Sequence, residues 1–195
     1  LFHPMGVEIF QRLCADTDVL VIGLSPTEAE RLGYQKASRA NPGLIVTLFT
    51  PFGLTSPHRD WTATELVLMH MSGVAYYTPG NVHDAEKEHP LKLGGRQAEF
   101  MAGMAGVVAT TAAIVHREWT GRGQIVDLAE RDVSMLANMW NIAIASYTGL
   151  QPPRKSEGHA TIAPLHMLPC KDGWVQIDCP EEEQWQGLLE VRFQG

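Results

Sequence analysis

One carboxylate, Glu99, stands out because of the residues on either side of it. It follows the glycine pair at 94–95 and precedes helical turns built from small residues, which leave space around its side chain. A carboxylate in open space can react. Two alternatives remain open. Acidic residues favour the first turn of a helix, where Arg96 could simply pair with Glu99, and the same helix start could bind an anion through its backbone amides alone.

Other chemistry-bearing residues are more scattered. The eight histidines show no spacing typical of a metal site, so the sequence predicts no metal. His159, in a loop after Gly158, is the histidine best suited to contact a ligand. Arg31, Lys36 and Arg39 gather around one helix end and could meet phosphates, although such groups are usually only solvated. The motifs GxSxG, GxxxxGK[ST] and GxGxxG are absent, which disfavours serine hydrolases, nucleotide triphosphatases and classical dinucleotide enzymes.

Composition narrows the class of protein. The chain has 195 residues with 45% hydrophobic and 19% charged residues, as is typical of a globular domain. No apolar run approaches the ~18 to 20 residues needed to cross a bilayer. The net charge of −7 disfavours nucleic acid and anionic membranes as partners. Three scattered cysteines, Cys14, Cys170 and Cys179, form no CxxC pair, which favours a reducing cytoplasm.

The first half of the chain predicts part of a parallel α/β sheet. Two runs rich in β-branched residues read as buried strands, and between them Ser25-Pro26 begins a helix that should end at Gly33. Strand, helix, strand implies a right-handed parallel crossover. The expected elements are a helix at 7–13, a strand at 19–22, a helix to Leu32, a strand at 44–49 and a helix at 62–71.

The second half predicts a long loop followed by long helices. The loop at 78–96 is aperiodic and contains glycine, as is common for functional or mobile loops. In the helix at 97–119, a face of small residues that includes Gly103 and Gly106 predicts a close approach by another element, because glycine otherwise weakens a helix. The remaining expected elements are a strand at 125–128, a helix at 130–147, short strands around 162–168 and 174–178, and a helix from Pro180.

The order of several short segments resembles the class III CoA-transferases, the family of formyl-CoA and carnitine CoA-transferases that is related to α-methylacyl-CoA racemase. The resemblance covers nearly the whole chain, and its specificity lies in the combination of segments. The segments that carry it are Asp18-Val19-Leu20-Val21, Arg31-Leu32-Gly33-Tyr34, Asn41-Pro42-Gly43-Leu44-Ile45, residues 52–60, Met71-Ser72-Gly73, Ala102-Gly103, His116-Arg117-Glu118, residues 120–128, Ile162-Ala163-Pro164 and Lys171-Asp172-Gly173-Trp174.

This resemblance implies a domain organisation. Residues 1–77 would be part of a Rossmann-like CoA-binding domain, residues 78–149 the active-site loop and long helices, and residues 150–195 the start of a small α+β linker domain. Members of the family are interlocked homodimers. The chain would then be an internal piece of a protein roughly twice as long.

The resemblance also implies a chemistry for Glu99. The family uses an aspartate at the start of the long helix, in a pattern like Ala-Asp-x-x-x-Gly, and this chain has Glu99 at that position, within Ala98-Glu99-Phe100-Met101-Ala102-Gly103. The family carboxylate attacks an acyl-CoA thioester, forms an anhydride and then becomes a CoA thioester that an acceptor acid resolves. Because glutamate is one methylene longer, an inactive member that only binds acyl-CoA or a partner chain is the alternative.

Further expectations concern the ligand and competing activities. The resemblance implies acyl-CoA and a small carboxylic acid as substrates, with Arg31, Arg39 and Lys92 near the diphosphate and Gly158 and His159 in a loop over the site. A racemase is disfavoured because Thr64 stands where that branch has a proton-transferring histidine. A generic α/β module that forms oligomers is a third reading.

Overall fold

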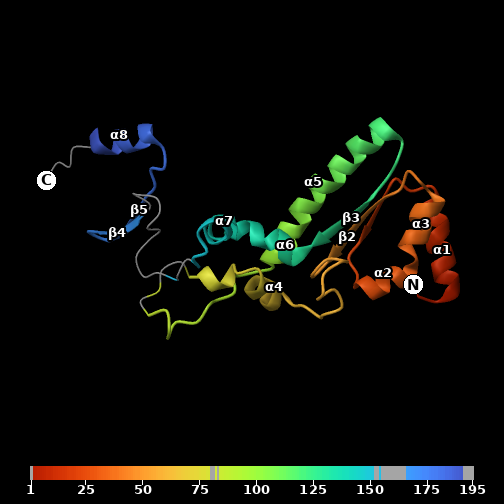
Figure 1. Ribbon diagram of the computed structural model, residues 1–195, viewed down its shortest axis with the longest axis horizontal. Helices are drawn as coiled ribbons and strands as arrows, with labels where there is room; N and C mark the ends of the chain where they lie inside the picture. The colour runs from red at the N-terminus through yellow and green to blue at the C-terminus, as the bar shows by residue number, and fades with distance from the viewer. Residues whose placement is uncertain (1, 80–81, 83, 152–153, 155–165, 191–195) are drawn as a thin grey trace.

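The computed structural model describes residues 2–79, 82, 84–151, 154 and 166–190 (Figure 1). The chain is a mixed α/β structure with a three-stranded parallel sheet. Its elements are α1 (Pro4–Ala15), β1 (Val19–Ile22), α2 (Pro26–Leu32), α3 (Tyr34–Ala40), β2 (Ile45–Thr50), α4 (Glu65–Met71), η1 (Ala75–Tyr77), α5 (Gln97–Thr120), β3 (Ile125–Ala129), α6 (Glu130–Met135), η2 (Leu136–Asn138), α7 (Met139–Thr148), β4 (His166–Cys170), β5 (Gly173–Ile177) and α8 (Glu182–Glu190).

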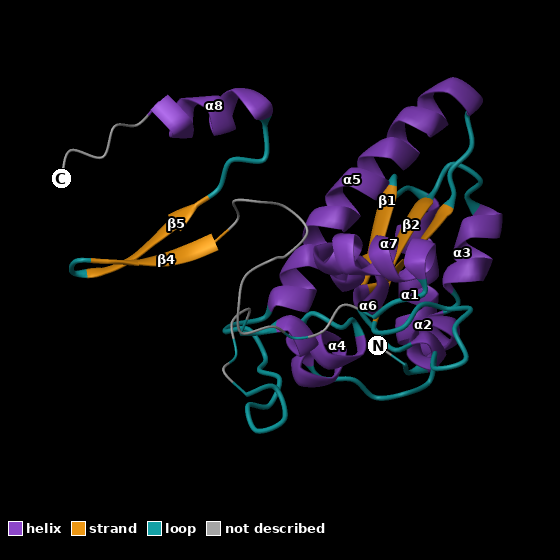
Figure 2. Ribbon diagram, turned by 60° about the vertical axis from the view of Figure 1, so that its left-hand side comes forward, coloured by secondary structure: helices purple, strands orange, loops and turns teal. Residues whose placement is uncertain are grey.

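The sheet has the order β1-β2-β3, with β2 in the centre. Val19 pairs with Ile45, and Val46 pairs with Ile125, so both pairs of strands run parallel. This confirms the predicted crossover from β1 through helices to β2. Helix α5 lies along one side of the sheet and α3 on the other (Figure 2). The carboxyl ends of the strands therefore share one edge, where the first turns of α2 and α6 also begin.

The two strands predicted to be buried differ in exposure. In β2 the side chains from Ile45 to Leu48 are fully buried, as predicted. The prediction is wrong for β1, where Val21 is 62% exposed. The physical reason is position, because β1 is an edge strand of the described sheet and β2 is its centre.

The helix between β1 and β2 begins and ends as its sequence predicts. Ser25 and Glu28 form a reciprocal capping box at the start of α2. Gly33 ends the helix with φ of 76°, a left-handed conformation that glycine adopts at low cost. Helix α3, which begins directly after Gly33, has no counterpart among the predicted elements.

The small-residue face of α5 packs against the sheet. Among its members, Ala98, Ala102, Gly106 and Ala113 are buried. A Cβ atom on Gly106 would overlap the Phe49 ring of β2, so any larger residue there would force that ring to move. Gly103 differs, because a Cβ atom there would have no neighbour within 4 Å. The close approach is thus confirmed for Gly106 and wrong for Gly103.

Helix α5 is also the one helix in the described part of the chain that could span a bilayer by length and composition. An 18-residue window within it has a mean hydropathy of 1.6, and 22% of that window is buried. The expectation that no stretch is long and apolar enough is therefore wrong for this helix. Core helices of globular proteins pass the same test, so the finding is weak support for a membrane span.

The helix predicted over 130–147 is interrupted. Helix α6 gives way to the 3₁₀ turn η2, and α7 begins at Met139. Asn138 leaves helical geometry with φ of −108° and ψ of 16°, and its side-chain amide donates a hydrogen bond to the Ser72 carbonyl oxygen at 3.3 Å. A contact with a residue 66 positions away thus breaks a locally helical pattern.

The final elements form a separate group. The two short strands predicted here form β4 and β5, which pair as an antiparallel hairpin, and α8 follows as predicted. Residues 162–165 of the expected first strand lie outside the described residues. We call residues 166–190 the terminal unit, and we call strands β1–β3 with helices α1–α7 the sheet body. In both ribbon views the terminal unit lies apart from the sheet body (Figure 1).

Candidate active site

Glu99 lies in the first turn of α5, as the sequence predicts. Its Oε2 atom is 3.1 Å from Nη1 of Arg96, and the two side chains are 45% and 78% exposed, respectively. The ion pair left open as an alternative therefore forms. An exposed pair three residues apart contributes roughly 0 to 1 kcal/mol, so it does not hold the carboxylate in place. Glu99 remains accessible for reaction.

Two further carboxyl groups lie near the first turn of α5. Glu65 begins α4, and its Oε1 atom accepts a hydrogen bond from the Ala98 backbone N–H at 3.0 Å. Its Oε2 atom is buried and has no hydrogen-bond partner among the described residues. Glu130 begins α6. Burial raises the pKa of the Glu130 carboxyl, and the negative charges of Glu99 and Glu65 raise it further.

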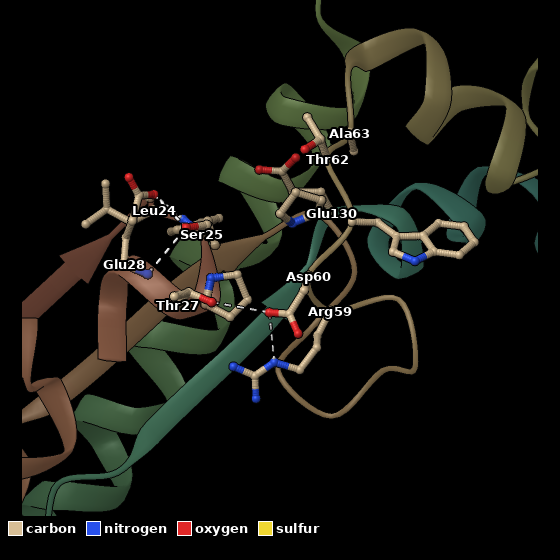
Figure 3. Close-up of a pocket in the computed structure, with 14 residues that line it drawn as sticks. Leu24, Ser25, Thr27, Glu28, Arg59, Asp60, Thr62, Ala63 and Glu130 are labelled. Carbon is tan, nitrogen blue, oxygen red and sulfur yellow. Dashed lines mark hydrogen bonds and ion pairs between the residues drawn. The ribbon is translucent and has the colours of Figure 1, made fainter. Parts of the chain in front are cut away.

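A cavity of about 540 Å³ opens at the carboxyl ends of β1 and β2 (Figure 3). This edge is where ligands bind in open parallel sheets. Ser25 and Thr27 lie on one side of the cavity, and Thr62 and Glu130 lie on the other. Glu99 does not line the cavity. Glu130 does line it, and the negative charge of Glu99 contributes to the raised pKa of its carboxyl.

The charged side chains of this cavity are largely paired. Arg59 donates to Glu30 at 2.8 Å and to Asp60 at 3.3 Å. The bond to Glu30 raises the pKa of the Arg59 guanidinium. Glu28 accepts from the hydroxyl and the backbone N–H of Ser25, which lowers the pKa of its carboxyl. The cavity therefore presents acidic and hydroxyl groups and one cation that is already engaged.

The loop after β2 separates this cavity from a second one of about 600 Å³ beside β3 and α6. The rings of His58 and Trp61 lie 4.0 Å apart between centroids at a tilt of 31°, and Phe52 makes T-shaped contacts with both. Leu54 N–H donates to Asp127 at 2.8 Å, which anchors the loop to β3. These contacts fix the loop that bears Arg59.

The residues expected to bind the diphosphate lie on different elements: Arg31 on α2, Arg39 on α3, and Lys92 just before α5, the helix that bears Glu99. Arg31 lies in the last turn of α2, and its guanidinium is 4.7 Å from the centroid of the Phe2 ring. Arg39 is exposed in the last turn of α3, towards the start of β2 and so at the opposite edge of the sheet. Lys92 donates to the carbonyl oxygens of Leu93 and Gly95 just before α5. Gly158 and His159 lie outside the described residues.

The remaining expectations concern metals and Thr64. Among the described residues, no group of three or more His, Cys, Asp or Glu side chains could hold a metal ion. Thr64 is the N-cap residue of α4, and its hydroxyl accepts from the Val67 backbone N–H at 3.5 Å. A side chain engaged in capping and without an imidazole has no route to exchange a proton with a substrate carbon.

The cavity residues Arg59, Asp60 and Glu130 and the capping role of Glu65 were not among the sequence-based predictions. One signal could have pointed to the first three, because each follows a strand in the chain, and carboxyl ends of parallel strands meet at one edge. No local signal could have found the Glu65 contact, which joins residues 33 positions apart.

Comparison with protein families gives a match over residues 1–193 to the family described as CoA-transferase family III. The chain is 31% identical over 98% of its length to the succinyl-CoA–L-malate CoA-transferase beta subunit of Chloroflexus aurantiacus. It is 28% identical over 96% of its length to the succinate–glutarate CoA-transferase of Agrobacterium fabrum. These stretches cover 47% and 46% of the two relatives, so the chain spans about half the length of the curated relatives it matches.

Solved structures also match this chain over nearly its whole length and over about half of their own. A CAIB/BAIF family protein from Brucella suis superposes with a TM-score of 0.74 at 27% identity, covering 96% of this chain and 49% of that one. Rv3272 from Mycobacterium tuberculosis superposes with a TM-score of 0.76 at 22% identity, which speaks for the fold alone.

Proposed function

Because the chain belongs to CoA-transferase family III, we propose that the protein containing it moves coenzyme A from an acyl-CoA to a carboxylic acid, with Glu99 as the nucleophile. The observation that carries the proposal is an accessible carboxylate in the first turn of α5, at the position where the resemblance places the reacting aspartate.

The chemistry needs only one carboxylate. A Glu99 oxygen bonds to the thioester carbonyl carbon, the C–S bond breaks, and CoA leaves as a thiolate. The thiolate attacks the Glu99 carbonyl carbon of the resulting anhydride, which releases the donor acid as a carboxylate and leaves Glu99 as a CoA thioester. An acceptor carboxylate then attacks that thioester, which breaks its C–S bond, releases CoA thiolate and forms a second anhydride. The thiolate attacks the acceptor's carbonyl carbon in this anhydride, and the bond from that carbon to the Glu99 oxygen breaks. Glu99 is regenerated as a carboxylate, with no net proton transfer.

The charge of the cavity suggests which part of the substrate lies in it. Its acidic groups repel a diphosphate, and its cation Arg59 already has two carboxylate partners. The cavity therefore suits the uncharged arm that carries the thioester. We assign the diphosphate to cations outside the cavity, with Arg31, Arg39 and Lys92 as the candidates, and a loop over the site to Gly158 and His159.

The wider architecture is proposed on the same basis. Residues 1–77 would belong to a Rossmann-like CoA-binding domain, residues 78–149 would carry the active-site loop and helices, and residues 150–195 would begin a small second domain. The protein would form an interlocked homodimer in the cytoplasm. The two curated relatives named above are CoA-transferases of small dicarboxylic acids by name, which favours a small carboxylic acid as acceptor.

One observation favours a second function. Glu99 is paired with Arg96 and does not line the cavity, and it is one methylene longer than the aspartate of the family pattern. A displacement of about 1 Å can cost roughly 100-fold in rate when reacting atoms must align. The alternative is a member of the family that binds acyl-CoA or a partner chain without transferring CoA.

Trapping of the covalent intermediate separates the two functions. The full-length protein is incubated with succinyl-CoA and acetyl-CoA in turn, treated with hydroxylamine, and digested for mass spectrometry. A CoA-transferase gives a hydroxamate on Glu99, because hydroxylamine displaces the thiol from a glutamyl thioester. Isothermal titration calorimetry measures CoA binding in parallel.

Two variants control the experiment. Glu99→Gln should bind CoA with unchanged affinity, give no hydroxamate and lose activity by about 10³-fold or more, since the nucleophile is absent. Glu99→Asp restores the residue of the family pattern and should keep the hydroxamate. An unmodified Glu99 together with intact CoA binding would establish the second function instead.

A further inference from the structure

Arg96 brings a cation to the proposed nucleophile. From the N-cap position of α5, its Nη1 atom donates to Oε2 of Glu99 at 3.1 Å. The Arg96 side chain makes no capping hydrogen bond, and 78% of it is exposed. An ion pair this exposed is weak. The guanidinium can therefore leave Glu99 for another acceptor at little cost.

The charge of this pair changes when Glu99 reacts. As a carboxylate, Glu99 balances the positive charge of Arg96. As a CoA thioester, Glu99 is uncharged, so the guanidinium loses its anionic partner in that state. The thioester state is also the one in which the acceptor acid, itself a carboxylate, must approach the Glu99 carbonyl carbon. A cation is thus released at the place and the stage at which an anion has to bind.

The other charged groups around the first turn of α5 do not attract an acid. The Glu65 carboxyl lies against this turn, because its Oε1 atom accepts from the Ala98 backbone N–H at 3.0 Å. An ionised carboxyl group there repels an approaching carboxylate. Lys92, four residues before Arg96, already donates to two backbone carbonyl oxygens. Arg96 is therefore the cation in a position to offset the repulsion.

We propose that Arg96 binds the acceptor acid at the glutamyl-CoA stage, through the charge that is released when Glu99 becomes a thioester. One oxygen of the acceptor accepts a hydrogen bond from the guanidinium, and the other bonds to the Glu99 carbonyl carbon. The C–S bond then breaks, CoA leaves as a thiolate, and no proton moves. This role rests on the proposed function of Glu99. It assigns recognition of the acid to a residue outside the cavity at the ends of β1 and β2.

Acid binding to variants of the full-length protein tests the charge argument without turnover. Glu99→Gln has an uncharged side chain, as the thioester does, so it leaves Arg96 without its anionic partner. In NMR titrations with ¹³C-labelled succinate and acetate, Glu99→Gln should bind with a Kd about 10-fold or more below that of the wild type. The double variant Glu99→Gln/Arg96→Met should lose this gain. Equal affinity in the wild type and Glu99→Gln, or an unchanged gain in the double variant, would overturn the proposal.

Isotope exchange tests the same role in the reaction. Under the proposed mechanism, labelled succinate enters succinyl-CoA through the Glu99 thioester, and labelled acetate enters acetyl-CoA in the same way, so the natural acceptor need not be known. Arg96→Met should raise the KM for the acid about 10-fold or more and leave the KM for the acyl-CoA within about twofold. Arg96→Lys keeps the charge and should recover most of the loss. An equal rise in both KM values, or no rise, would contradict acid binding by Arg96.

A second exposed ion pair provides the matched control. Arg12 pairs with Glu8 in α1 at 2.7 Å, and its side chain is 77% exposed. Arg12→Met should therefore leave acid binding and exchange unchanged. If the wild type exchanges no label but Glu99→Gln gains acid binding through Arg96, the function of Glu99 fails and the acid site stands. If the wild type exchanges label and Arg96→Met has the same KM for the acid, the acid site fails and the function stands.

Discussion

The sheet body and the terminal unit both contain strands and helices, yet they differ in what holds them together. The sheet body buries a cluster that includes Leu44, Val46 and Leu48, packed between helices and strands. In the terminal unit, no residue of β5 or α8 is buried, and Trp174 is 69% exposed. Local pattern is therefore enough to form a hairpin and a helix, but among the residues whose burial the structure describes, only those of the sheet body form a core.

The largest effect should come from the centre of the sheet. Leu48 is fully buried in β2, so Leu48→Ala should lower the free energy of unfolding by about 2 to 5 kcal/mol through lost transfer energy and a cavity. Urea unfolding followed by circular dichroism measures this change. A loss below about 1 kcal/mol would mean that the sheet body lacks the packed core we describe.

A second substitution tests the close contact between α5 and the sheet. Gly106→Val should cost about 1 to 3 kcal/mol, because its Cβ atom would overlap the Phe49 ring. Gly103→Ala is the matched control on the same helix, and it should stabilise the protein by up to about 1 kcal/mol, since nothing lies near its Cβ atom. Thermal unfolding of both variants shows whether the two substitutions change the Tm in opposite directions.

A third substitution tests a local contribution within the sheet body. Ser25→Ala removes the cap of α2 and should cost about 1 kcal/mol at neutral pH. The bonds from Ser25 lower the pKa of Glu28, so that contribution is present at neutral pH and is lost as pH falls through the lowered pKa. The difference in Tm between variant and wild type should therefore narrow on acidification, and a constant difference would contradict this linkage.

The smallest effect should come from the terminal unit. Trp174→Ala should change the free energy of unfolding of this chain by less than about 0.5 kcal/mol, because the side chain is mostly exposed. Urea unfolding measured as for Leu48→Ala provides the comparison. A loss as large as that of Leu48→Ala would erase the distinction between the two regions.

The parts of the fold that could be predicted depend on neighbours in sequence. The β1 strand, the capping box of α2 and the helix ends at Gly121 and Gly149 follow from local patterns, and the structure has them. The interruption at Asn138 and the exposure of Val21 depend on contacts or positions set by distant parts of the chain. Local patterns could not reveal them.

The candidate site divides in the same way. Glu99 and Arg96 lie three residues apart, and a helical pattern is enough to predict that their side chains can form an ion pair. Asp60 meets Thr27, and Glu65 meets Ala98, each across 33 residues, so both contacts exist only once the sheet body has formed. A reactive carboxylate could be predicted at Glu99 from local sequence, whereas the residues that surround it in space could not.

Arg117 has a consequence for the order in which the chain folds. From the last turn of α5, its Nη1 atom donates to Asp18, 99 residues earlier, and to the carbonyl oxygen of Gly43. Contacts between such distant segments slow folding because long loops must close before they form. During synthesis, β1 and β2 emerge well before α5 and β3, so we expect the far edge of β2 to stay unpaired for that interval. Pulse-labelling hydrogen exchange during refolding should find the amides of β3 protected last.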